Sequence, residues 1–182
     1  YTARRKFFAL AGQVYIRRPD GELLCYVRQT LFKLKEEITV FADENRTEPL
    51  LEIRARQIID FAAAYDVSDA ISGQKLGMLK RRGFASLLRD EWLVMDSEDR
   101  AVARLREASR WGALASRLLS LIPQRYILET TDGKTVALVR QRFAFFVHEF
   151  DIDFPPAETD AIDRKLAIAS LILLLLIEGR QG

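Results

Sequence analysis

The amino-acid sequence predicts a mainly β protein, in which a closed antiparallel barrel surrounds a buried hydrophobic C-terminal helix. Two observations predict this fold class. About eleven segments have the pattern of short strands joined by polar turns, and the uncharged residues 166–177 are apolar on every face of a helical wheel. A helix without a polar face must be enclosed by protein or by lipid. A sheet of about eleven strands loses its exposed edges on closure, and a barrel of that size can hold a central helix.

The strands are predicted from apolar or alternating stretches bounded by turn residues. Pro19-Asp20-Gly21 indicates a hairpin turn, because proline presets a turn dihedral and glycine supplies a positive φ. In residues 50–56 apolar and charged side chains alternate, as in a half-buried strand. Several hairpins share one layout, in which an Asp-containing turn leads into a strand that ends in Arg or Lys. The predicted strands are 13–18, 22–29, 38–41, 50–56, 59–67, 74–81, 92–95, 101–106, 126–129, 135–142 and 145–153.

Residues 109–122 depart from this pattern and predict an amphipathic helix. Ser109 can cap its start and Pro123 stops it. Its apolar side chains fall on one face, so we expect it to lie on the sheet or to close one end of the barrel. The alternative is a helix on a membrane surface, although its polar face holds few basic residues for that role.

The apolar C-terminal stretch is too short to cross a bilayer comfortably. As a helix, residues 166–177 span roughly 18 Å, against a hydrocarbon core of about 30 Å. Its only polar side chain is Ser170. We therefore expect a core helix wrapped by the strands and no transmembrane span.

The composition is that of a single globular domain. An apolar fraction of 49% with 30% charged residues is typical of a globular domain, and 182 residues need only one. The net charge of +2 is too small to indicate a nucleic-acid binder by itself. The single cysteine, Cys25, excludes an internal disulfide and fits a reducing compartment, so we expect a cytoplasmic protein.

Three stretches, taken in their order along the chain, resemble the tubby C-terminal-like superfamily. Residues 21–38 (GELL, then FKLKEEI) look like the opening of LURP-one-related proteins. Residues 65–81 (YDV, then LGMLKR) look like a hairpin of phospholipid scramblases and their relatives, and residues 150–167 (FDIDFP, then KLA) are similar to the scramblase C-terminus. The resemblance implies a single domain over residues 1–182, with about twelve strands around the helix. It also implies a non-enzymatic binding or scaffold function of the LURP-one-related type.

The resemblance further implies peripheral binding of anionic phospholipid or phosphoinositide at a membrane, or else a protein partner. The alternative is a scramblase-like membrane protein that has lost its calcium response. Scramblases carry an acidic cluster where this chain has Phe146, Val147 and His148, and a cysteine-rich stretch where it has only Cys25.

The sequence contains no residue set that predicts an enzyme, a metal site or a cofactor. No phosphate-binding glycine motif is present, and His148 is the only histidine. Cys25 is expected to be a small buried hydrophobe, the alternative being a reactive thiol. Glu149, Asp151 and Asp153 alternate on one strand, where they form either the start of a cation site or, as we expect, a solvated outer face.

Basic side chains recur two residues apart on three predicted strands, at positions 54/56, 104/106 and 140/142. Such residues could meet anionic headgroups. The candidate anionic-lipid surface consists of Lys80, Arg81, Arg82, Arg140 and Arg142. The alternative is an ordinary solvated exterior in which Glu52, Glu107 and Glu129 offset the arginines.

The enclosed helix predicts a specific failure of folding. Burial of each Leu or Ile side chain is worth roughly 1.5–3 kcal/mol, so Leu173→Asp, or truncation before Leu166, should leave an insoluble or unfolded chain. The soluble fraction and the cooperativity of unfolding test this expectation. A soluble truncated chain that unfolds cooperatively would contradict the enclosed-helix fold.

Overall fold

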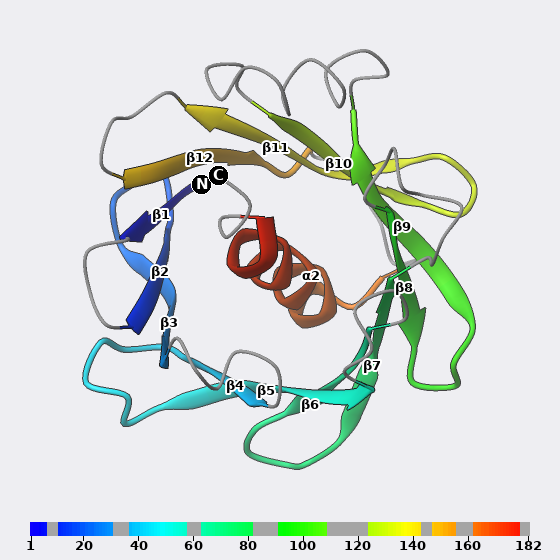
Figure 1. Ribbon diagram of the computed structural model, residues 1–182, viewed down its shortest axis with the longest axis horizontal. Coiled ribbons are helices and arrows are strands. Elements are labelled where there is room, and N and C mark those ends of the chain that lie inside the picture. Colours follow the sequence, from blue (N-terminus) through cyan, green and yellow to red (C-terminus); the bar gives the residue numbers. More distant parts are fainter. Residues whose placement is uncertain are drawn as a thin grey trace.

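In the part of the chain that the structure describes, twelve antiparallel strands close into a barrel around one helix (Figure 1). This computed structural model describes residues 1–6, 11–30, 37–57, 63–81, 91–108, 124–142, 147–155 and 162–178. Successive strands pair with each other, and β1 pairs with β12 to complete the ring, which confirms the predicted fold class. The strands are β1 (Thr2–Lys6), β2 (Ala11–Arg17), β3 (Leu23–Thr30), β4 (Glu37–Phe41), β5 (Pro49–Gln57), β6 (Ala64–Asp69), β7 (Lys75–Arg81), β8 (Glu91–Asp96), β9 (Ala101–Glu107), β10 (Arg125–Thr130), β11 (Thr135–Arg142) and β12 (Val147–Asp153).

The first strand, β1, has no counterpart among the strands predicted from the alternation of residues. Ala3 is its only apolar residue; it is buried, while Arg4 is exposed. A single apolar residue leaves no alternation to detect. In the structure β1 lies between β2 and β12 and closes the barrel. The helix predicted at residues 109–122 lies outside the described residues.

Alternation along the strands places apolar side chains inside the barrel, as predicted for β5. Leu51 and Ile53 are at most 2% exposed, whereas Arg54 and Arg56 are exposed. The inward side chains of the other strands join them in one core cluster. The barrel wall therefore has an apolar inner face and a charged outer face.

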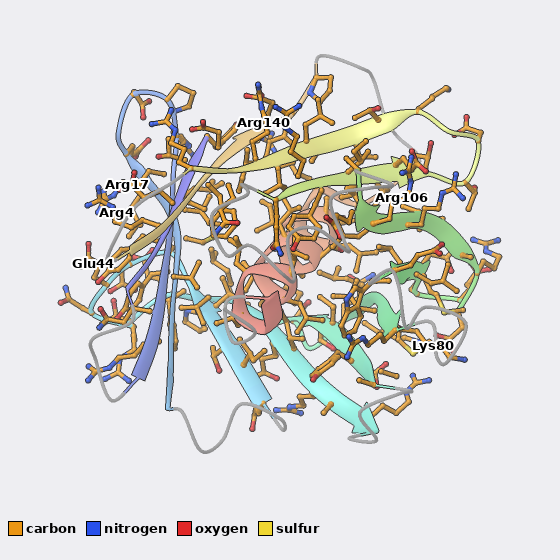
Figure 2. The ribbon with its side chains drawn as sticks, turned by 45° about the horizontal axis from the view of Figure 1, so that its top comes forward. Arg4, Arg17, Glu44, Lys80, Arg106 and Arg140 are labelled. Carbon is orange, nitrogen blue, oxygen red and sulfur yellow. The ribbon has the colours of Figure 1, made fainter. Side chains whose placement is uncertain are left out.

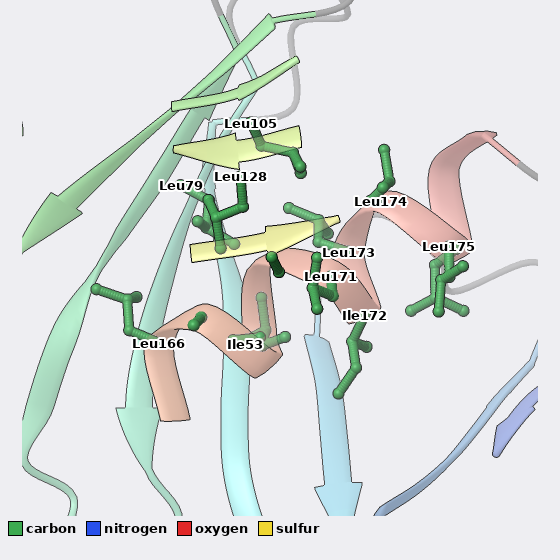
Figure 3. Packing of buried hydrophobic residues seen from close by; sticks show 14 of the residues in the cluster. Ile53, Leu79, Leu105, Leu128, Leu166, Leu171, Ile172, Leu173, Leu174 and Leu175 are labelled. Carbon is green, nitrogen blue, oxygen red and sulfur yellow. The ribbon is translucent and has the colours of Figure 1, made fainter. Parts of the chain in front are cut away.

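The apolar C-terminal stretch forms helix α2 (Arg164–Glu178), which lies in the centre of the barrel (Figure 1). From Leu166 to Leu176 every side chain except the half-buried Ile168 is at most 3% exposed. Figure 3 shows these leucines facing strand residues such as Leu79 and Leu128. The buried Ser170 hydroxyl donates a 2.8 Å hydrogen bond to the carbonyl of Leu166, so it is satisfied within the helix. Among the described residues, no helix has the length and apolar character needed to cross a membrane.

One end of the barrel, which we call the turn rim, consists of five hairpin turns (residues 18–22, 42–48, 69–74, 96–100 and 131–134). Each turn contains an aspartate whose carboxylate accepts hydrogen bonds from the turn itself. Asp43, for example, accepts the N–H groups of Thr47 and Glu48 at 2.9 Å each. Four of these carboxylates satisfy N–H groups that the strand ladder leaves free, whereas Asp132 accepts from the hydroxyl of Thr130 at the end of β10. The turn aspartates are Asp20, Asp43, Asp69, Asp96 and Asp132.

Helix α2 begins at the turn rim, where it is capped and tied to the wall. Asp163 is the N-cap, since its carboxylate accepts the N–H groups of Lys165 and Leu166 at 2.8 and 3.1 Å. The Lys165 ammonium donates to the carboxylate of Asp69 in the β6–β7 turn. The guanidinium of Arg164 donates to the Tyr1 hydroxyl at 2.9 Å. The entry of the helix into the barrel is thus held by contacts to two sides of the rim.

Gly77 of β7 lies tightly between the neighbouring strand and the start of the helix. A Cβ added there would lie 2.2 Å from the Met95 carbonyl oxygen and 2.8 Å from Cδ2 of Leu166. The first of these atoms belongs to the backbone of the paired strand β8, so it cannot move without disturbing the ladder.

Gly77→Ala should therefore destabilise the protein by about 1–3 kcal/mol or more, as overpacked cores do. The urea midpoint measures the loss. Ala101→Val is the control, because it adds methyl groups at an exposed strand position and should change stability by less than about 0.5 kcal/mol. Equal midpoints for Gly77→Ala and the parent chain would contradict this close packing.

The lowered pKa of Asp69 predicts how the stability of the fold changes with pH. The hydrogen bond from Lys165, followed by those from the Ser72 backbone and side chain, holds the pKa of this carboxyl well below its usual value of 3.8. A pKa that folding lowers contributes stability above the unfolded value and loses it as the pH falls. The parent chain should therefore lose this contribution as the pH drops below about 4.

Asp69→Asn should be less stable at neutral pH and should lose less on acidification than the parent chain. Urea midpoints between pH 2 and pH 7 test this, with Lys165→Met and the double variant completing a cycle. Additive effects of the two substitutions would show that the ion pair does not couple the helix to the turn.

Candidate functional site

The structure places the predicted basic residues in two groups on the outer wall. Lys80 and Arg81 lie at the end of β7, whereas Arg140 and Arg142 lie on β11. Three strands, β8, β9 and β10, separate the two groups. Figure 2 shows Lys80 and Arg140 in different parts of the wall, and Arg82 lies outside the described residues. These residues do not form one continuous patch.

The group on β11 is paired with the carboxylates of β12. Arg142 Nε donates to Asp151 at 2.7 Å, and Arg140 pairs with Asp153. The third carboxylate of the strand, Glu149, pairs with Arg4 of β1. The hydrogen bond that Arg142 donates to Asp151 raises the pKa of the Arg142 guanidinium above its ordinary value. The acidic row on β12 therefore serves as the cross-strand partner of arginines on both neighbouring strands.

The other basic pairs of the sequence are also neutralised across strands. Arg56 binds Asp66 through two hydrogen bonds, of 2.9 and 2.7 Å, and Arg54 lies 3.0 Å from Glu37. These partners lie on β6 and β4, one on each side of β5. In the sequence, the charged residues that alternate along these strands could have indicated such pairs. Which arginine meets which carboxylate is known only once the register between the strands is known.

Glu129 of β10 has the most enclosed carboxylate of this network, with 9% of its side chain exposed. One of its oxygens, Oε1, accepts from Arg104 Nε at 2.6 Å and from Arg106 Nε at 2.9 Å. These bonds hold the pKa of Glu129 below its ordinary value, and the bond from Arg106 has the larger effect. One buried carboxylate thus fixes two arginines on the outer face of β9.

Some exposed basic side chains differ from this pattern, and Arg46 of the β4–β5 turn and Arg125 of β10 are among them. Lys80 on β7 and Arg28 on β3 are exposed, and neither has an ion-pair partner within the described part of the chain. Beside Lys80, the Arg81 guanidinium lies 5.9 Å from the centre of the Trp92 ring. Within the described residues, Lys80 and Arg28 therefore present positive charge without an ion-pair partner.

A surface pocket of about 410 Å³ crosses β11, β12, β1 and β2, with the β4–β5 turn at its edge. Arg4, Arg17 and Glu44, which Figure 2 labels, lie together on its wall. Arg17 Nη2 lies 3.3 Å from Glu44, and Arg4 is paired with Glu149. Tyr15 also lines the pocket. The pKa of its hydroxyl is raised, mainly by burial and to a smaller extent by the charge of Tyr26. Because its arginines are matched by carboxylates, the pocket offers mixed charge rather than a cationic site.

The sequence contained no signal for this pocket. Its residues come from distant parts of the chain and meet only because β1 pairs with both β2 and β12. Since β1 was not among the predicted strands, neither its neighbours nor the pocket could be inferred.

The sequence offered one cysteine and one histidine as candidate reactive groups. Cys25 is 2% exposed within the core cluster, and burial raises the pKa of its thiol to about 12. A thiol held neutral in this way behaves as a small hydrophobe rather than a nucleophile. His148 pairs in β12 with Arg5, and its side chain lies outside the described residues. Among the described residues, no three His, Cys, Asp or Glu side chains are grouped so as to hold a metal ion.

Comparison with known proteins gives one match. A protein-family model described as LURP-one-related matches residues 23–117, just over half of the chain. No curated protein and no solved structure matches the chain. The matched region runs from the start of β3 to beyond the end of β9.

Removal of the Glu129 charge should destabilise the outer wall. Glu129→Gln leaves Arg104 and Arg106 without their shared carboxylate, at an expected cost of about 1–2 kcal/mol, since both guanidiniums are partly hydrated. Urea unfolding at pH 7 measures the loss.

Glu98→Gln is the matched control for this variant. It removes the same charge from the exposed β8–β9 turn, where Glu98 pairs only with the exposed Arg100 among the described residues. Its expected effect is below about 0.5 kcal/mol. Similar losses for the two variants would mean that Glu129 is no more important than a solvated ion pair.

Proposed function

The chain belongs to the LURP-one-related family, and on this premise we propose that it is a non-enzymatic binding domain that attaches peripherally to membranes containing anionic phospholipid. The ligands would be phosphatidylserine or phosphoinositide headgroups. The observation that carries the proposal is the exposed positive charge of Lys80 on β7 and Arg28 on β3, neither of which has an ion-pair partner among the described residues. Each basic residue near an anionic bilayer contributes about 1 kcal/mol of attraction.

The ion-paired arginines support the same function. The side chains of Arg54, Arg140 and Arg142 remain 55–61% exposed although each is paired. Exposed pairs are weak, so a guanidinium there can exchange a carboxylate for a phosphate at little cost. Arginine also binds phosphate through two parallel hydrogen bonds. The paired wall residues thus add binding capacity beyond the side chains that have no ion-pair partner.

The non-enzymatic part of the proposal rests on the packing of the barrel interior, which helix α2 occupies. The inward face of the described wall packs against α2, and the only cysteine is buried with a raised pKa. Among the described residues, the charged groups lie mainly on the outer wall, where most of them form ion pairs with one another. Such a surface is suited to binding.

Vesicle co-sedimentation tests the proposed function. At low ionic strength, the chain should sediment with vesicles containing phosphatidylserine or phosphatidylinositol 4,5-bisphosphate and remain in the supernatant with pure phosphatidylcholine. Binding should weaken as salt is raised towards 0.5 M, because the attraction is electrostatic.

No sedimentation with either anionic vesicle at low salt would refute the proposal. A scramblase-like activity, the alternative function, is read in parallel by loss of fluorescent lipid from the inner leaflet of reconstituted vesicles. We expect no acceleration above protein-free vesicles, because α2 is enclosed by the barrel and not exposed to lipid.

A further inference from the structure

The surface pocket that crosses β1 carries both signs of charge on its walls. Its volume of about 410 Å³ lies within the range of sites that hold small ligands. Three guanidiniums and three carboxylates line it, namely those of Arg4, Arg17, Arg142, Glu44, Glu149 and Asp151. A ligand that complements such a wall carries a positive and a negative group of its own.

The strand register explains why the wall is hollowed at this point. Thr2 of β1 lies directly between Asp151 of β12 and Arg17 of β2. Its side chain is exposed and much shorter than the charged side chains on either side. Two residues further along β1, Arg4 lies opposite Glu149 of β12. The short Thr2 side chain thus leaves a space that long charged side chains surround.

The ion pairs of the pocket leave donors and acceptors for a ligand. Each pair joins a single guanidinium nitrogen to a single carboxylate oxygen, as in the 2.7 Å contact of Arg142 Nε with Asp151 Oδ2. A guanidinium has five N–H donors, and a carboxylate accepts at both of its oxygens. Among the described residues, the remaining N–H groups of Arg4 and Arg142 and the second oxygens of the β12 carboxylates are therefore open to a ligand.

The two signs of charge lie at different depths. The side chains of Glu149 and Asp151 are 30% and 27% exposed, whereas those of Arg4 and Arg142 are 58% and 59% exposed. The β12 carboxylates are thus nearer the floor and the guanidiniums nearer the mouth. Neighbouring strands are about 4.8 Å apart, which separates the carboxylates of β12 from Arg4 on β1. A ligand that meets both groups has its positive end inward and its negative end about one strand spacing away.

We infer that this pocket binds a zwitterion with a primary ammonium and a phosphate about one strand spacing apart, as in phosphoethanolamine. The ammonium donates to the carboxylates of Glu149 and Asp151, and the phosphate accepts from the guanidiniums of Arg4 and Arg17. In phosphoethanolamine two carbon atoms and one oxygen join nitrogen to phosphorus, which suits this spacing. The site is separate from Lys80 and Arg28, so it goes beyond the proposed attachment to anionic lipid.

The same chemistry has two sources, the free compound and the headgroup of phosphatidylethanolamine. In the headgroup the ammonium is the free end and the phosphate is the point of attachment to the lipid. The depth of the carboxylates fits both sources, because the phosphate faces the mouth of the pocket in either case.

Calorimetric titration of the chain with O-phosphoethanolamine tests the pocket, with three control ligands. Inorganic phosphate offers only the anion, ethanolamine offers only the ammonium, and phosphocholine has both charges but no ammonium N–H group. O-phosphoethanolamine should bind at least about tenfold more tightly than each control. An absence of binding up to about 10 mM, or equal affinity for any of the three controls, overturns the inference.

Matched variants locate the ligand in this pocket. Thr2→Gln fills the hollow and should weaken the binding of O-phosphoethanolamine by about tenfold or more. Thr39→Gln makes the same change on the outer face of β4, outside the pocket, and should change the affinity less than about twofold. Arg4→Met should also weaken binding, whereas Arg140→Met removes an equally exposed, ion-paired arginine that does not line the pocket. Equal effects of a variant and its control, with unchanged urea midpoints, overturn the site.

Asp151→Asn separates the two charges of the ligand. It should weaken the binding of O-phosphoethanolamine, because a carboxylate that faces the ammonium is lost. It should strengthen the binding of inorganic phosphate, because the pocket becomes more positive. Equal weakening of both ligands would show that Asp151 only supports the wall, and would overturn its assigned role.

Vesicles distinguish the two sources of the ligand and separate this inference from the proposed function. A mixture of phosphatidylethanolamine and phosphatidylcholine carries no net charge, so sedimentation with it that Thr2→Gln removes identifies the lipid headgroup as the source. Titration with O-phosphoethanolamine but no sedimentation with these vesicles identifies the free compound. Arg28→Gln with Lys80→Gln should weaken sedimentation with phosphatidylserine vesicles and leave the titration unchanged. A double variant that loses both kinds of binding overturns the separate pocket.

Discussion

The structure depends on one constraint, which is that helix α2 has no polar face. Its side chains from Leu166 to Leu176 are almost entirely removed from water. At roughly 1.5–3 kcal/mol for each large apolar side chain, their burial is a leading contribution to stability. A single layer of sheet cannot cover a helix on all sides, so the strands must close around it. The pairing of β1 with β12 accomplishes this closure.

Enclosure has a consequence for the helix ends. The first N–H groups of a helix have no partners within it, and a buried end must find them elsewhere. Asp163 supplies a carboxylate to two of these groups, while Lys165 and Arg164 tie the same turn to Asp69 and Tyr1. The aspartates that shape the hairpin turns surround this point. The chemistry of the turns and the capping of the helix therefore belong to the same end of the barrel.

With the interior occupied by packing, interactions with other molecules fall to the outer wall. Cross-strand ion pairs cover much of it, and the small net charge of +2 hides their uneven arrangement. Individually these exposed pairs contribute little to stability. The membership of the LURP-one-related family describes the scaffold, and the charge on this wall carries the proposed binding.

Several features follow from the sequence because they depend on local chemistry. The enclosed helix follows from the absence of polar residues between positions 166 and 177, and the inward face of β5 follows from the alternation around Leu51 and Ile53. The resemblance to LURP-one-related proteins is confirmed by the match over residues 23–117. Strand β1 could not be predicted, because a strand with a single inward alanine derives its stability from its two neighbours.

Only the tertiary structure decided which charges meet. Alternation assigns a side chain to a face of the sheet, but it does not say which strand lies beside it or in what register. Lys80 and Arg142 are therefore both outward, as their spacing indicates, yet they lie on strands separated by three others. Likewise the pairing of Arg142 with Asp151, and the pocket over β1, exist only because closure brings the two ends of the chain together. Residue pattern determined what is buried, and strand order determined what is adjacent.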